Sequence, residues 1–184
     1  MRHIKSHKKF SWEQGCWLLV SVLLLYGAIF TILQNNMSIL NIARPLGFIM
    51  LISGAINFLV CELKNREIHG ANWLIADGII AICLSIFPLF NKLVSPILVP
   101  FFFCIWEMVS GVLKVMDSAE LKSHKMECWQ GFAVIGCIEM LSGAVSLLKP
   151  FDDIVGMGNV IAAIFFIQAC GFMLKTAMYH HLVD

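Results

Sequence analysis

Long apolar runs dominate the chain, and short polar stretches separate them. A helix needs about 20 mostly apolar residues to cross a bilayer. Six runs meet this length, at about 16–33, 44–61, 73–90, 93–115, 130–148 and 154–176. Apolar residues occupy all sides of each run, which is typical of helices surrounded by lipid and by other helices. The pattern therefore predicts an all-α fold class, a polytopic membrane protein with six transmembrane helices, and not a β-barrel of short alternating segments.

The composition supports a membrane protein. The chain has 184 residues, of which 59% are hydrophobic and 14% are charged. A soluble domain has about 45–50% apolar and about 25% charged residues, and one of this size leaves too much surface exposed to hide the excess. The formal net charge is only +1, which gives no reason to expect a nucleic-acid partner.

The distribution of positive charge predicts the orientation. Ten of the 13 lysines and arginines fall in the N-terminal tail, the second and fourth connections or the C-terminal end, and three fall on the other side. Positive charge is enriched on the cytoplasmic side, so both termini are expected to be cytoplasmic. In this count, Lys114 and Lys175 are expected to extend out of their helices to the inner face. Residues 1–15 are predicted to be a basic cytoplasmic tail and residues 16–184 a single transmembrane domain.

A repeat is visible in the tryptophans. Trp17, Trp73 and Trp129 are separated by 56 residues each, and each stands near the start of an apolar run. A glycine recurs in the second run of each unit. The chain is therefore expected to consist of three parallel helical hairpins that enter the membrane in the same sense. Their approximate bounds are 16–71, 72–127 and 128–176.

Several short stretches together resemble a known family. The Trp-led hairpins, the prolines after the first helix of units two and three, the pairs Ser53-Gly54 and Ser110-Gly111, and the stretch IGCIEM at 135–140 are similar to the HdeD family of small bacterial inner-membrane proteins. The first unit departs from that pattern at Gln34-Asn35, and Glu107 has no obvious counterpart. The resemblance implies location in the bacterial inner (plasma) membrane and an association with acid resistance, but no molecular mechanism.

Five polar side chains stand inside the predicted spans and form the candidate site. An acidic residue at the bilayer centre costs about 2.5–3.5 kcal/mol on insertion scales, so such residues are expected to face the interior of the bundle. The candidates for a proton or polar site are Glu107, Glu139, Gln168, Asp77 and Asn57.

Glycines accompany most of these polar residues at helical spacing. Small residues let helices approach closely in a membrane, and a spacing of three or four residues places two side chains on one helix face. The predicted helix-packing positions are Gly54, Gly111, Gly136, Gly143 and Gly171.

Two functional interpretations remain open. The polar residues either join helices by hydrogen bonds or form a site that binds protons or a polar solute. The seven cysteines and six histidines show no metal-ligand spacing, and no catalytic or cofactor motif is present. We therefore expect a non-enzymatic membrane protein without cofactor or metal, and the resemblance to the HdeD family implies a role in acid or envelope stress.

The alternative is a small proton-linked transporter or channel that uses Glu107 and Glu139. The expected partners are membrane lipids, with a second copy of the chain or another membrane protein left open.

Overall fold

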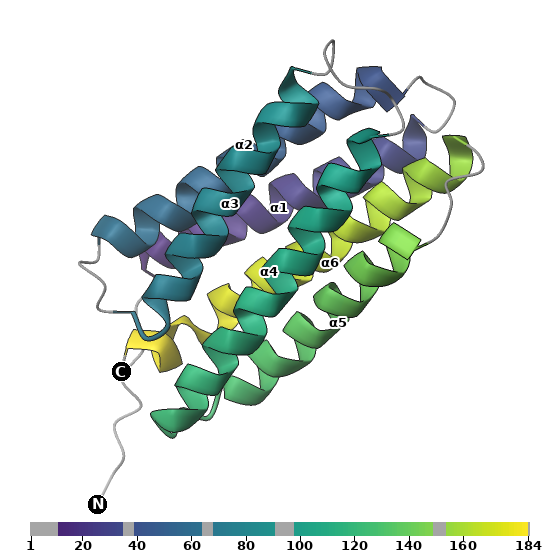
Figure 1. The fold of residues 1–184 in the computed structure, drawn as a ribbon. Coiled ribbons are helices and arrows are strands. Elements are labelled where there is room, and N and C mark those ends of the chain that lie inside the picture. The colour runs from purple at the N-terminus through teal and green to yellow at the C-terminus, as the bar shows by residue number, and fades with distance from the viewer. Residues whose placement is uncertain (1–10, 35–38, 64–67, 91–97, 149–153, 184) are drawn as a thin grey trace, which may run out of the picture.

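The computed structural model describes residues 11–34, 39–63, 68–90, 98–148 and 154–183. These residues form six α-helices and no strand (Figure 1). The helices are α1 (Trp12–Leu33), α2 (Ile39–Leu63), α3 (Ala71–Leu89), α4 (Leu98–Ser123), α5 (Trp129–Leu148) and α6 (Ile154–Val183). All six are long and apolar enough to cross a membrane, so the predicted all-α fold class with six spans is confirmed.

Several helix boundaries differ from the prediction: α2 begins earlier, at Ile39, and α6 ends later, at Val183, and the start of α1 and the end of α4 also differ. α1 begins at Trp12 because Ser11 and Gln14 form a capping box, in which each side chain bonds to the backbone N–H of the other. The predicted tail therefore ends before residue 15, and its residues 1–10 lie outside the described part of the chain. α4 continues past residue 115 to Ser123. Asp117 and Ser118 in this last part are buried, which a count of apolar residues does not register.

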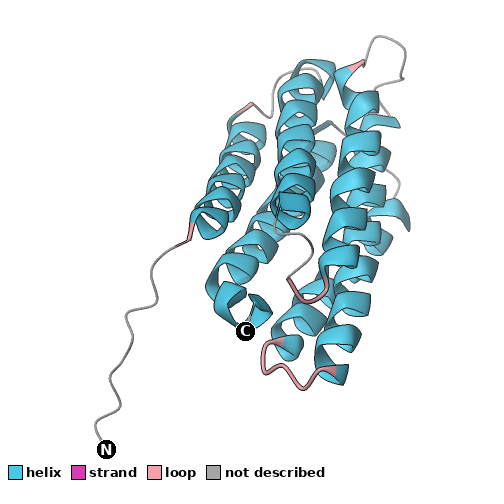
Figure 2. Cartoon of the chain, turned by 90° about the vertical axis from the view of Figure 1, so that its left-hand side faces the viewer, coloured by secondary structure: helices cyan, strands magenta, loops and turns pink. Residues whose placement is uncertain are grey.

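The helices form a bundle in which α1 begins and α6 ends at the same end (Figure 1). We call this the terminal end and the opposite one the far end. α1, α3 and α5 all start at the terminal end and run in the same direction (Figures 1 and 2). This is the arrangement expected of three parallel hairpins, each with one helix out and one helix back.

The most extensive helix contacts lie between successive hairpins. α2 packs most closely on α3, α4 on α5, and α1 on α6, which closes the ring. A larger share of α2, α4 and α6 than of α1, α3 and α5 is buried, and α4 also contacts α2 and α6. The second helix of each hairpin therefore forms the inner layer, and the polar residues it carries face one another.

Candidate functional site

A buried lysine lies at the centre of the polar network. Lys114 of α4 forms an ion pair with Glu139 of α5, and it also donates to Ser110 at 2.8 Å and to Gln168 of α6 at 3.3 Å. The Lys114 side chain is 2% exposed and that of Glu139 is 0% exposed. One ammonium group therefore ties three helices together in the interior of the bundle.

The second buried glutamate is joined to this lysine through an amide. Gln168 accepts from Lys114 with its oxygen and donates to Glu107 with its nitrogen, at 2.8 Å. Ser142 of α5 also donates to Glu107, at 3.1 Å. Glu107, Gln168, Lys114 and Glu139 thus form one connected set of side chains, which we call the Lys114 cluster together with Ser110 and Ser142.

A second lysine organises the other candidates. Lys175 of α6 lies 3.5 Å from the Asp77 carboxylate and donates to the Asn57 oxygen at 3.5 Å. Asn57 of α2 in turn donates to Asp77 at 3.1 Å and to the Leu74 carbonyl at 3.0 Å, both in α3. We call Asn57, Asp77 and Lys175 the Lys175 cluster. It joins α2, α3 and α6.

The two clusters are neighbours along the bundle. Ser110, which accepts from Lys114, also faces the Asp77 carboxylate. An α-helix rises 1.5 Å per residue, so Asn57 and Asp77 lie about 9 Å from the terminal ends of their helices. On α4, Lys114 lies about 14 Å and Glu107 about 24 Å from the same end of the bundle. The network therefore runs from near the terminal end to beyond the middle of the bundle.

The prediction that Lys114 and Lys175 extend to the inner face is wrong. Both are at most 2% exposed and bond to acidic or amide groups of other helices. A buried ammonium group is retained when a carboxylate compensates its charge, and Glu139 and Asp77 supply that charge here. Two of the ten positive charges assigned to the cytoplasmic side therefore belong to the core.

The structure brings all five candidate side chains into this network and adds others. Glu107, Glu139, Gln168 and Asn57 are 0% exposed and Asp77 is 6% exposed. The sequence reasoning missed the residues that connect them: Ser110, Lys114, Ser142 and Lys175. The sequence held one indication that Ser110 and Lys114 belong with Glu107. The three residues are spaced by three and four positions and so share one face of α4.

The predicted packing glycines lie where backbones meet or where the network needs room. A Cβ on Gly54 would lie 2.7 Å from the Gly78 carbonyl oxygen, and one on Gly111 would lie 2.7 Å from that of Gly136. Gly143 meets the backbone of Met108 in the same way. These contacts explain how α2 and α4 approach their outer neighbours so closely.

Gly171 has a different role from the other four glycines. A Cβ at this position would lie 2.9 Å from Oε1 of Glu139 and 3.3 Å from the Lys114 side chain. Its missing side chain leaves space for the central ion pair.

The chemistry of the network is that of proton binding and hydrogen bonding. Its members are carboxylates, ammonium groups, amides and hydroxyls. Oε1 of Glu139 and Oδ1 of Asp77 accept no hydrogen bond from a described residue. Within the described ranges, no group of three or more His, Cys, Asp or Glu could hold a metal ion. Buried carboxyl and ammonium groups of this kind can exchange protons.

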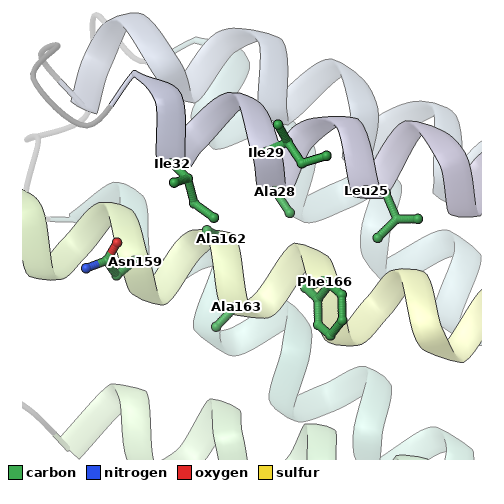
Figure 3. A pocket seen from close by; sticks show the side chains of 8 residues that line it. All are labelled: Leu25, Ala28, Ile29, Ile32, Asn159, Ala162, Ala163 and Phe166. Atoms are coloured by element: carbon green, nitrogen blue, oxygen red, sulfur yellow. The ribbon is translucent and has the colours of Figure 1, made fainter.

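An apolar cleft of about 370 Å³ lies apart from this network, between α1 and α6 (Figure 3). Its walls are aliphatic and aromatic except for the amide of Asn159. Ile29, Ile32 and Phe166 on its rim are more than half exposed. In a membrane this surface faces the hydrocarbon, so the cleft suits an acyl chain better than a polar solute.

Comparison with known families gives one match. The family described as a short repeat of unknown function (DUF308) matches residues 19–90 and 76–149. The two matched segments begin at positions whose offset is close to the 56-residue spacing of the tryptophans. The matches span α1 to α5, and so include Glu107, Lys114 and Glu139. No curated protein and no solved structure matched the chain.

Proposed function

We propose, since this chain belongs to the DUF308 family of short repeats, that it is a non-enzymatic, HdeD-like membrane protein that supports tolerance of acid or envelope stress. The observation that carries the proposal is the buried Lys114–Glu139 ion pair and its connection to Glu107 through Gln168. Three membrane helices are held together by groups whose bonding depends on their protons. We assign the chain no reaction.

The network makes the packing of the bundle responsive to acid. Glu139 on α5 and Glu107 on α4 both accept hydrogen bonds with their carboxyl oxygens. Protonating either one changes the bonds that join α4, α5 and α6. Because Lys114 keeps its positive charge in acid, its pairing with Glu139 is the contact that a proton would alter most.

The proposed location is the bacterial inner membrane with both termini in the cytoplasm. Lys122 and Lys125 are exposed at the terminal end, and exposed positive charge is enriched on the cytoplasmic side. The proposed partners are membrane lipids, which the apolar cleft between α1 and α6 supports. Self-association and contact with another membrane protein stay open.

A survival assay tests the proposal. Cells of the source bacterium that lack the gene are exposed to acid and complemented with the wild-type gene, with Glu139→Gln or with Glu127→Gln. Glu127 is exposed and gives the matched control. We expect survival with the wild type and with the control, and reduced survival with Glu139→Gln at equal protein level. Equal survival with and without the gene would refute the stress role.

A second candidate is a small proton-linked transporter or channel. It is favoured by one observation, that Glu107 and Glu139 belong to a single network and not to separate helix contacts. Purified protein in liposomes would be tested for proton flux with a pH-sensitive dye. Flux in the wild type that both Glu107→Gln and Glu139→Gln abolish, and Glu127→Gln preserves, would support transport. Absence of flux would exclude the transporter and leave the first proposal, a protein that does not transport protons.

A further inference from the structure

Asp117 is a buried carboxyl that the network described above does not bond. Its side chain lies in α4 and the residue is 1% exposed. Neither carboxyl oxygen has a hydrogen-bond partner among the described residues. An ionised carboxylate is costly to bury without such partners, and binding a proton removes that cost. Ionisable groups buried in membrane proteins in this way commonly mark proton pathways.

Its position continues the polar stripe of α4. Glu107, Ser110, Lys114 and Asp117 are spaced by three, four and three residues, which places them on one helix face. Asp117 is the member of the stripe nearest the terminal end, about 9 Å from the end of α4 at 1.5 Å per residue. It therefore lies between the Lys114 cluster and the water at that end, at about the same depth as Asn57 and Asp77.

The N-cap residue of α3 covers this carboxyl. Gly70, at the start of α3, has a φ of 77°, and a Cβ added to it would lie 1.8 Å from Oδ1 of Asp117. The backbone of Gly70 thus rests directly on the carboxyl. The neighbouring His69 ring lies 5.2 Å from the ring of His124, just beyond the end of α4. Gly70 is itself buried, whereas the neighbouring His69 is partly exposed and His124 is exposed, so water at the terminal end reaches the residue next to this contact.

The charged surroundings couple Asp117 to both clusters. Lys175 acts on it most strongly among the neighbouring charges. The titratable and charged groups that face it from α2, α3, α4, α6 and the start of α5 are Cys61, Asp77, Lys114, Glu120, Lys175 and Cys128. A proton gained or lost at Asp117 therefore changes the field at Lys175 and Lys114, which hold the helices together.

We propose that Asp117 is a proton-binding site through which the buried network exchanges protons with water at the terminal end. The proton would come from bulk water past the Gly70 link and would leave to water or to the neighbouring Asp77 carboxylate. What the protein uses this proton for rests on the proposed function. The site itself can be measured whether or not the stress role holds.

Carbodiimide labelling tests the site. Dicyclohexylcarbodiimide reacts with protonated carboxyls in apolar surroundings: the carboxyl gives its proton to a nitrogen of the reagent, its oxygen adds to the central carbon, and the product rearranges to a stable N-acylurea. Mass spectrometry of the full-length protein in detergent would quantify this adduct at Asp117 between pH 5 and pH 9. We expect labelling that falls as the pH rises. We also expect faster labelling by a water-soluble carbodiimide in Gly70→Ala, because the added methyl group displaces the link. No adduct at Asp117 at any pH would overturn the proposal.

A neutral isostere separates proton binding from a structural role. Asp117→Asn should keep or raise the melting temperature, and a potentiometric titration of it should show about one proton fewer bound per chain between pH 9 and pH 5 than in the wild type. An unchanged proton count, or a fall in melting temperature as large as that of Lys114→Met, would overturn the proposal. Failure of the acid-survival assay with labelling at Asp117 intact would refute only the stress role.

Discussion

Lys114 and Glu139 form an ion pair in the interior of the bundle, where the two side chains are 2% and 0% exposed. The pair joins α4 to α5, two helices that are long and apolar enough to cross a membrane. Removing one member leaves the other as an uncompensated buried charge. This relationship gives the first prediction.

Lys114→Met and Glu139→Gln should each lower the free energy of unfolding by about 3–5 kcal/mol, because each leaves a buried group without its partner. The double variant Lys114→Met/Glu139→Gln should lose less than the sum of the single variants. Thermal unfolding in detergent micelles would measure this. Lys122→Met, at an exposed lysine over the Trp129 ring, should cost at most about 1 kcal/mol. Additive losses in the double variant would contradict the pairing.

Lys114 and Lys175 should resist a water-soluble amine reagent in the folded protein. Both are buried, whereas Lys122 and Lys125 are exposed. Mass spectrometry after brief treatment with an acetylating reagent should find adducts at the exposed pair and none at the buried pair. All four should react after unfolding in dodecyl sulfate. Modification of Lys175 at the rate of Lys122 would show that it reaches the interface after all.

Gly54→Ala should destabilise the contact of α2 with α3 by about 1–3 kcal/mol, because the added methyl group meets backbone atoms that cannot move alone. The nearest is the Gly78 carbonyl oxygen, at 2.7 Å. Gly131→Ala is the matched control, since its Cβ would meet only the flexible side-chain ends of Met178 and Leu174, at 3.1 and 3.3 Å. That variant should be neutral or slightly stabilising, because alanine favours the helix. Equal melting temperatures for the two variants would exclude a close backbone contact.

Gln168→Glu should destabilise the bundle more at neutral than at acid pH. The amide nitrogen donates to Glu107 at 2.8 Å, and a carboxylate in its place would repel that glutamate. In acid the new carboxyl carries a proton and can donate the same bond. The melting temperature of Gln168→Glu, taken relative to the wild type at the same pH, should therefore rise as the pH falls from 7.5 to 5. Gln168→Met lacks any titratable group and should show a deficit that does not shrink in acid. A constant deficit in both variants would mean that Gln168 does not face an ionised Glu107.

Much of the fold could be predicted from local properties. A membrane helix satisfies its backbone hydrogen bonds within itself, so the length of an apolar run is enough to predict a span. Lys114 shows where this reasoning stops. Its four-carbon chain suits either the interface or the interior, and the choice depends on Glu139, which lies 25 positions away. The same is true of Lys175, whose partner Asn57 is 118 positions distant.

The sequence by itself determined the 56-residue repeat, through the spacing of its tryptophans. It also determined the six spans and the polar residues that must face protein, because these follow from the cost of burying polar groups in lipid. Only the tertiary structure decided that α1 packs on α6 and that the lysines enter the core. It also decided that Asp117 lies beneath Gly70. The physical reason is that a buried charge is stabilised by groups brought in from other helices, and those groups are neighbours in space and not along the chain.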